Sequence, residues 1–451
     1  MKRKILIALL VLLLAGIGYG TYYIAQLGPI ISGYAAKNLA SDVFLGHRSQ
    51  KSVEAIDLNF SFIKYTRNTV DFRKKEVVSR FLWFSSKAIY VDGFGCILLR
   101  DSSEQSLRSL SKYKIKPASL QIPTDNIPWP EGDKVSDTIP SGINILKMNR
   151  VLEDVVAGKN GYKGTFAVAV AYKGALVAEK YAPGFSAGNR FLSWSMAKSF
   201  TNALTAIMVK KGLLDIYKPA DIPEWKNDKR NCVTINNLLH MNSGLEWNED
   251  YGNLSDVTLM LHEQSDMARY TYEHPMQCRP DSLWKYSSGT TNIVSYLIRK
   301  KLGKEAYLQF PEKELFSKIN MRSAVFEIDE TGTFTGSSYL YASLRDYVRF
   351  GLLYLNNGNW IGQQLFPSDW VRYTVTPARG SGGRYGAFFW LNASSDFPKA
   401  PKDMFLCRGH DGQFIFIIPS LQLVVVRTGC SKKGEFDENK FITSVISSII
   451  K

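Results

Sequence analysis

One serine–lysine pair at the start of a long apolar run constrains the fold of this chain most strongly. Ser195 and Lys198 are three residues apart, and the segment 200–209 that follows them is mostly apolar. Apolar residues recur at the spacing of one helical face, at positions 197, 200, 204, 207 and 208. Lys210, Lys211 and Gly212 are typical of a helix end. The pattern predicts a buried helix whose first turn carries Ser195, with Lys198 one turn later on the same side.

A serine and a lysine in this arrangement can perform nucleophilic catalysis. A backbone N–H in the first helical turn has no partner within the helix, and a lysine in apolar surroundings loses its proton readily enough to act as a base. The spacing alone is a weak signal. The same spacing to a lysine occurs at Ser61, Ser109, Ser111 and Ser282. Ser195 differs from them because a predicted hairpin precedes it and a buried helix follows it.

Two later segments can complete a site around this pair. Tyr286 lies in the segment 284–289, and we expect a neighbouring lysine to lower the pKa of its phenol, so that the phenol exchanges protons with Ser195. The segment 408–413 contains two glycines, which allow the backbone to approach a ligand closely. We expect the N–H of Gln413, at the start of a strand, to stabilise a developing oxyanion together with the N–H of Ser195.

Together these segments resemble the serine β-lactamase and penicillin-binding fold, in the branch of class C β-lactamases, esterases, DD-peptidases and 6-aminohexanoate-dimer hydrolases. The matching pieces are Ser195-Met196-Ala197-Lys198, Tyr286-Ser287-Ser288 in place of Tyr-x-Asn, and His410-Asp411-Gly412 in place of Lys-Thr-Gly. Gly336-Ser337-Ser338-Tyr339, which leads into 342–346, resembles the nylon-oligomer hydrolase type. The likeness covers about 145–451. It implies an α+β fold in which an antiparallel sheet is flanked by helices and carries a helical subdomain.

The resemblance also implies roles for the matching residues. Ser195 is the expected nucleophile, Lys198 and Tyr286 are its acid/base partners, and the amides of Ser195 and Gln413 form the oxyanion hole. Substrate binding is expected from Trp194, Ser288, His410 and Gly412. The resemblance implies no metal and no organic cofactor.

Two departures from the family pattern bear on the substrate. Ser288 is a shorter hydrogen-bonding group than asparagine, and His410 is a weaker and pH-dependent cation than lysine. Because a fixed cation would hold the carboxylate of a β-lactam, its replacement disfavours β-lactamase activity. It favours an amide or ester substrate with a different anchor, for which Arg408 and Trp194 are the candidates.

The N-terminus carries a membrane signal. Met1-Lys2-Arg3-Lys4 is followed by no charge until Lys37, and residues 5 to 25 are mostly apolar. About 20 residues at 1.5 Å each cross a bilayer core, and the basic residues in front place the N-terminus in the cytoplasm. A cleaved signal peptide is the alternative, which would leave a secreted protein. Either way, we expect the catalytic domain outside the cytoplasm, in the periplasm or extracellular space.

The chain divides into three predicted parts: 1–27 as anchor or signal, 28–144 as an N-terminal extension ending in a Pro-rich linker, and 145–451 as the hydrolase domain. In the extension, 53–58 and 88–91 are predicted strands, and 116–141 is the linker. In the hydrolase domain, strands are predicted at 165–172, 175–181, 413–418 and 421–427. Helices are predicted at 145–156, 235–241, 255–263, 290–302, 312–319, 343–356 and 441–450. Strands at both ends with helices between them predict one antiparallel sheet with a helical insertion.

Charge and cysteine content exclude other classes. The net charge is +15, yet no nucleic-acid-binding motif is present, and none of the five cysteines forms Cys-x-x-Cys. We therefore predict a membrane-anchored extracytoplasmic serine hydrolase acting on a small-molecule or peptide-like amide or ester. The alternatives are a DD-peptidase or β-lactamase, and a non-catalytic module that binds an anionic envelope polymer through its basic surface.

Overall fold

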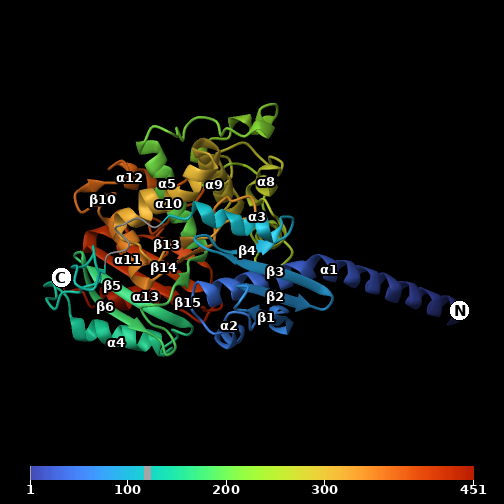
Figure 1. Ribbon diagram of the computed structural model, residues 1–451, viewed down its shortest axis with the longest axis horizontal. Coiled ribbons are helices and arrows are strands. Elements are labelled where there is room, and N and C mark those ends of the chain that lie inside the picture. The colour runs from blue at the N-terminus through green and yellow to red at the C-terminus, as the bar shows by residue number, and fades with distance from the viewer. Residues whose placement is uncertain (1, 116–122, 451) are drawn as a thin grey trace.

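A six-stranded antiparallel sheet forms the centre of the hydrolase domain (Figure 1). The structure is a computed structural model that describes residues 2–115 and 123–450. In spatial order the strands are β12 (Trp390–Leu391), β13 (Phe405–Gly409), β14 (Gln413–Ile418), β15 (Leu423–Gly429), β5 (Thr165–Tyr172) and β6 (Ala175–Tyr181). The first strands of the domain thus pair with its last strands, as predicted.

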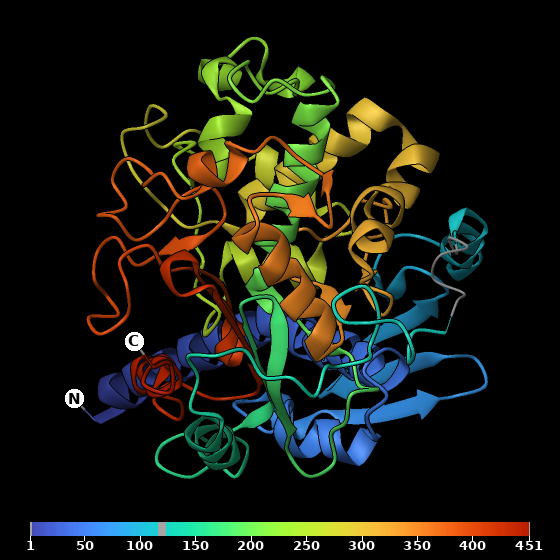
Figure 2. The same ribbon diagram turned by 90° about the vertical axis from the view of Figure 1, so that its left-hand side faces the viewer.

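Helices cover both faces of this sheet, which explains why its central strands are almost wholly apolar (Figure 2). Along β15, Val424 and Val426 face one hydrophobic cluster, whereas Leu423 and Val425 face the other. The first cluster includes α5 (Ala197–Lys210) and α11 (Leu344–Leu355). The second includes α4 (Ile145–Val156) and α13 (Glu438–Ile446).

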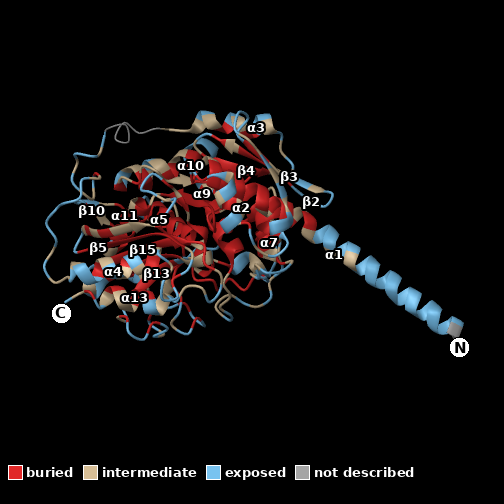
Figure 3. Cartoon of the chain, turned by 90° about the horizontal axis from the view of Figure 1, so that it is seen from below, coloured by how far each residue is buried: buried red, intermediate tan, exposed pale blue. Residues whose placement is uncertain are grey.

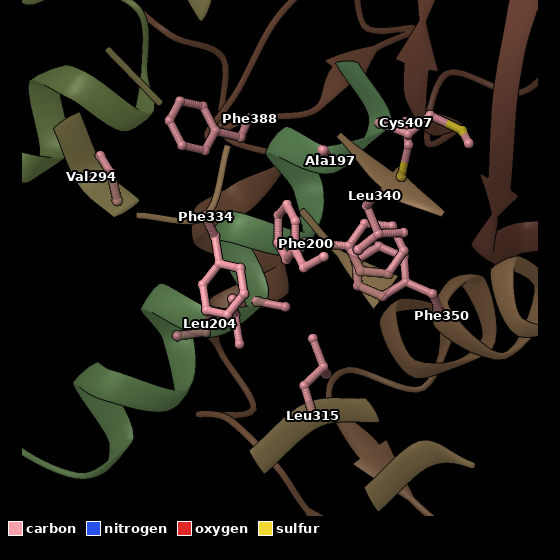
Figure 4. Close-up of a cluster of buried hydrophobic side chains, with 14 of the residues drawn as sticks. Ala197, Phe200, Leu204, Val294, Leu315, Phe334, Leu340, Phe350, Phe388 and Cys407 are labelled. Carbon is pink, nitrogen blue, oxygen red and sulfur yellow. The ribbon is translucent and has the colours of Figure 1, made fainter. Parts of the chain in front are cut away.

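The predicted helix after Ser195 is α5, and it is the most deeply buried helix of the domain. Every residue from Ala197 to Met208 is buried. Phe200 stacks on Phe350 of α11 at 3.7 Å between ring centroids, and Leu204 packs in the same cluster (Figure 4). Because α5 is fixed along its whole length, the serine and lysine in its first turn are held rigidly.

The remaining elements lie between β6 and β12 and form the predicted helical insertion. The helices are α6 (Ile235–Leu239), α7 (Asp256–Glu263), α8 (Met267–Tyr272), α9 (Ser288–Leu302), α10 (Lys304–Pro311) and α12 (Trp370–Thr374). The short strands are β7 (Phe191–Leu192), β8 (Val325–Phe326), β9 (Leu340–Ala342), β10 (Asn359–Trp360) and β11 (Gln363–Gln364). The segment 312–319, predicted as an independent helix, instead continues α10 as a π-turn and a 3-10 turn.

The N-terminal extension forms a second, four-stranded antiparallel sheet. Its strands are β1 (Arg67–Asp71), β2 (Glu76–Phe81), β3 (Phe84–Val91) and β4 (Gly95–Leu99), accompanied by α2 (Gln50–Ile56) and α3 (Glu104–Arg108). The predicted strand 88–91 lies in β3. The predicted strand 53–58 is wrong, because the Ser49 hydroxyl caps the segment as helix α2 by accepting from the N–H of Ser52. Of the predicted linker, 116–122 lies outside the described residues.

The helix α1 (Lys2–Phe44) runs across the predicted boundary between residues 27 and 28. Its first half is exposed, and its second half is buried against the N-terminal sheet (Figure 3). The Lys37 ammonium forms a buried ion pair with Glu327 of the hydrolase domain. Among the described residues, α1 is the one helix long and apolar enough to cross a membrane.

Candidate active site

The nucleophile turn is strained and firmly tied to its surroundings. Ser195 lies in the 3-10 turn Trp194–Met196 that leads into α5, and Trp194 has a φ of +45°, in the left-handed region. The N–H of Ser193 donates to Leu340 O at 2.8 Å, and the Ser193 hydroxyl donates to Ser338 O at 3.3 Å. These bonds join the turn to β9 and the predicted segment 336–339, so that the unfavourable backbone conformation is maintained.

Lys198 lies within hydrogen-bonding distance of three oxygens. Its Nζ is 2.9 Å from Ser195 Oγ, 2.9 Å from Ser288 Oγ and 3.1 Å from Ser337 O. The side chain is buried, and burial lowers its pKa to about 8, although the charge of Glu249 acts in the opposite direction. With a pKa of about 8, about a tenth of this lysine is a neutral amine at pH 7, far more than for an ordinary lysine.

The orientation of this amine follows from Glu249, which the sequence interpretation missed. The Glu249 carboxylate accepts from the N–H of Ser288 at 2.8 Å and from the hydroxyl of Ser288 at 2.5 Å. Because the Ser288 hydroxyl donates its proton to Glu249, it can only accept from Lys198. A neutral amine then donates its two N–H groups to Ser288 and Ser337 and directs its lone pair at Ser195.

Tyr286 lies beside both members of the serine–lysine pair. Its ring centroid is 4.8 Å from the Nζ of Lys198, and the Ser195 side chain is near enough to the phenol to act on its pKa, in the lowering direction. The expected lowering of its pKa is wrong: burial, together with the charge of Glu249, raises the pKa of Tyr286 well above its ordinary value. The resting site therefore holds a protonated phenol, and of the two predicted proton carriers Lys198 has the pKa nearer to neutral pH.

Tyr251 is a second residue that the sequence interpretation missed. Its hydroxyl is 3.4 Å from Ser288 Oγ, and burial raises the pKa of this phenol. Its ring stacks on His410 at 5.1 Å, with 19° between the planes. The loop 246–255 that carries Glu249 and Tyr251 has no regular apolar spacing, so no local sequence signal identifies either residue.

The predicted substrate-binding residues Trp194 and His410 meet at this site. Their rings are 5.4 Å apart, and the His410 side chain is 42% exposed. Gly412 follows in the same turn with a φ of +84°, and its carbonyl accepts from Arg427 at 2.6 Å. Arg408, the other candidate anchor, pairs with Glu438 at 2.7 Å instead.

The predicted oxyanion strand approaches the nucleophile turn through Gly409. A Cβ at this position would lie 2.3 Å from Ser193 O, so only glycine allows this contact. Gln413 pairs with Gly409 across the hairpin, and its side chain faces β15, where Oε1 accepts from the N–H of Gly429 at 3.0 Å. The proposed role of the Gln413 amide remains a prediction.

With this geometry in place, the comparisons with known proteins decide the family. Residues 152–440 match the Beta-lactamase family model. The chain belongs to the Beta-lactamase family. It is 23% identical to the 6-aminohexanoate-dimer hydrolase of Paenarthrobacter ureafaciens over 277 residues, which cover 56% of this chain and 69% of that protein. As a member of the family with this likeness, the protein is a serine hydrolase.

Solved structures show the same Beta-lactamase-family fold. A Bacillus anthracis protein assigned as a 6-aminohexanoate-dimer hydrolase has a TM-score of 0.54 at 24% identity, covering 67% of this chain and 79% of that one. The D-alanine carboxypeptidase AmpC of Burkholderia cenocepacia has a TM-score of 0.52 at 14% identity, covering 68% and 100% respectively. The family match begins at residue 152, so α1 and the N-terminal sheet lie outside it.

Proposed function

We propose that this protein is a membrane-anchored, extracytoplasmic serine hydrolase that cleaves an amide or ester through an acyl-enzyme on Ser195. The observation that carries the proposal is the position of Lys198 Nζ, 2.9 Å from Ser195 Oγ. Its remaining donors are engaged by Ser288 and Ser337. A base whose lone pair faces the serine hydroxyl can accept the hydroxyl proton as Oγ attacks the substrate carbonyl carbon.

The proton follows a closed route in this mechanism. Lys198 accepts the proton of Ser195 as Oγ bonds to the substrate carbonyl carbon, and the oxyanion receives hydrogen bonds from the Ser195 amide and, as predicted, the Gln413 amide. The Tyr286 phenol donates its proton to the departing amine or alcohol, and it regains a proton from Lys198. Lys198 then takes a proton from the attacking water and passes it to Oγ as the bond between Oγ and the acyl carbon breaks, which releases the carboxylic acid product and restores Ser195 and both proton carriers.

Two further features favour an uncharged or distally anchored amide or ester over a β-lactam. His410 stands where the wider family has a lysine, and its ring is engaged by Tyr251 and Trp194. The likeness to 6-aminohexanoate-dimer hydrolases supports a short linear amide.

The exposed apolar half of α1, preceded by basic residues, supports the membrane anchor with the catalytic domain outside the cytoplasm.

Labelling with a fluorophosphonate tests the mechanism. The parent protein should gain one adduct on Ser195, and Ser195→Ala should gain none and should lose hydrolysis of short esters and 6-aminohexanoate dimers. Ser282→Ala is the matched control, because Ser282 is also followed three residues later by a lysine but is exposed. Labelling that persists in Ser195→Ala overturns the assignment. Preferential turnover of D-Ala-D-Ala peptides or a cephalosporin would instead support the DD-peptidase or β-lactamase alternative.

A further inference from the structure

The tip of the β2–β3 hairpin exposes two large apolar side chains. Leu82 is 60% exposed and Trp83 is 68% exposed, and the two form the entire turn between the paired residues Phe81 and Phe84. Two-residue turns favour glycine, asparagine and aspartate. An apolar pair at such a turn is not explained by the packing of the hairpin, since neither side chain is buried.

The backbone at this tip is also unfavourable for its residue. Leu82 has a φ of +54°, in the left-handed region where glycine is favoured and branched side chains are strained. A polar residue or glycine would relieve both the strain and the exposure. Because Ile361, in the turn between β10 and β11, combines a φ of +48° with 54% exposure, it is the place of the Leu82–Trp83 tip beside α1 that points to a task outside the fold.

The hairpin lies along α1, with its tip at the point where α1 leaves the protein. A Cβ on Gly28 would lie 2.1 Å from the Phe84 ring, Ser32 and Ser86 hydrogen-bond at 2.8 Å, and Phe44 lies 6.1 Å from Tyr90. Thus β3 runs in the same direction as α1. Figures 1 and 3 show the tip beside the exposed apolar half of this helix.

Positive charge lies directly behind the tip. Arg67 and Arg80 are paired across β1 and β2, both are exposed, and neither has an ion-pair partner within the described part of the chain. Like charges in directly opposed positions destabilise a sheet unless an anion neutralises them. Beside the hairpin, Phe62 is 54% exposed, and its ring lies 6.4 Å from that of Phe81.

We propose that the Leu82–Trp83 tip, with Phe62, inserts into the interfacial layer of the bilayer that α1 crosses, and that Arg67 and Arg80 bind headgroup phosphates. Tryptophan and arginine are suited to this layer, where apolar side chains meet anionic groups. The tip lies beside the exposed apolar half of α1, so the surface that it contacts is the same bilayer that α1 crosses, rather than another protein. The proposal rests on the membrane anchor of the proposed function and adds a second contact, which fixes the orientation of the catalytic domain.

Nitroxide labelling of the full chain in phosphatidylcholine–phosphatidylglycerol nanodiscs tests this contact. The exposed Cys232 and half-buried Cys278 are replaced by serine, and a single cysteine is introduced by Ser85→Cys beside the tip. The matched control is Arg73→Cys in the β1–β2 turn, where Phe72 lies 6.0 Å from Phe44. Since 16 residues of α1 separate Gly28 from Phe44, this turn is about 24 Å farther along the helix.

The bilayer contact predicts three results from collision with oxygen and with a water-soluble nickel chelate. The label at 85 favours oxygen, the label at 73 favours nickel, and the combined Leu82→Ser/Trp83→Ser change moves the label at 85 outward by about 5–10 Å. A label at 85 as accessible to nickel as the label at 73 overturns the proposal. So does a label at 85 shielded from both reagents, which indicates a protein contact.

A further label separates failure of the contact from failure of the anchor. Ile17→Cys lies in the exposed apolar half of α1. A deep label at 17 with an aqueous label at 85 refutes the tip contact and leaves the anchor standing. An aqueous label at 17 refutes the anchor on which both proposals depend.

Discussion

Replacing Glu249 with glutamine should extend the activity of this hydrolase to lower pH. Hydrogen bonds of 2.5 Å and 2.9 Å link Glu249 to Ser288 and Ser288 to Lys198, which places the carboxylate about 5 Å from the ammonium. At an effective dielectric constant near 20, such a pair is worth about 3 kcal/mol, or roughly 2 pH units in the pKa of the lysine. The amide oxygen of glutamine keeps an acceptor for the Ser288 hydroxyl, whereas its NH2 group replaces the oxygen that accepts from the N–H of Ser288 and the indole N–H of Trp247, so the variant loses these two bonds together with the charge.

The direction of the shift follows from the charge. The carboxylate favours the protonated lysine, so its removal lowers the pKa of Lys198 further below about 8. Because the base must be neutral, the acid limb of the kcat/KM profile moves to lower pH by up to about 2 units.

The assay is a kcat/KM profile on a short ester between pH 5 and pH 10, measured for the parent, Glu249→Gln and Glu246→Gln. Glu246 is the matched control because it is exposed and lies three residues away on the same loop. An acid limb that stays in place, or moves to higher pH, in Glu249→Gln would show that Glu249 does not set the protonation of Lys198. An equal shift in both variants would show a general effect of surface charge.

Three other changes test separate parts of the molecule. Tyr286→Phe should lower kcat by about a hundredfold to ten-thousandfold, because the leaving group loses its proton donor, and an active-site burst assay measures the loss. Gly409→Ala should lower kcat about a hundredfold without abolishing folding, because its Cβ displaces Ser193 and misplaces the nucleophile turn. Lys37→Met should cost about 3–5 kcal/mol of stability, because Glu327 keeps a buried charge without its partner, and thermal unfolding in detergent detects the loss.

Each of these changes has a control of the same type. Tyr217→Phe removes an exposed hydroxyl and should leave kcat unchanged. Gly188→Ala places a Cβ 3.7 Å from its nearest neighbour and should be tolerated. Lys218→Met breaks an exposed pair with Asp215 and should cost no more than about 1 kcal/mol. Equal losses in a variant and its control would refute the specific role assigned to the first residue.

Local sequence patterns correctly predicted the helices and strands whose formation depends on contiguous residues alone. The spacing of apolar residues after Ser195 located α5. Two mostly apolar segments around the turn Lys173-Gly174 located the β5–β6 hairpin with its bounds at Thr165–Tyr172 and Ala175–Tyr181. The family resemblance then related the distant segments around Ser195 and Tyr286 to one another. Neither inference depended on the environment of a side chain.

Features that depend on contacts between distant segments of the folded chain were not predicted correctly. Glu249 and Tyr251 come from an irregular loop, and only the folded chain brings them to Ser288. The pKa of Tyr286 rises because burial outweighs the neighbouring lysine, and no sequence pattern measures that burial. The segment 53–58 contains the β-branched residues Val53 and Ile56, yet the cap at Ser49 starts a helix that includes its first four residues.

The helix α1 reaches the candidate active site through direct contacts. Tyr34 stacks on Trp194 at 6.3 Å between centroids, so a residue of α1 supports the strained backbone that holds the nucleophile. Tyr34 follows Gly28 by six residues, or about 9 Å along the helix axis. For the membrane anchor proposed above, an end at residue 27 in a flexible linker would leave the catalytic domain free to turn, whereas a continuous helix would fix the height of Ser195 near the bilayer surface. The proposed contact of the hairpin tip beside Gly28 would then remove the rotation about the helix axis that a single helix leaves free.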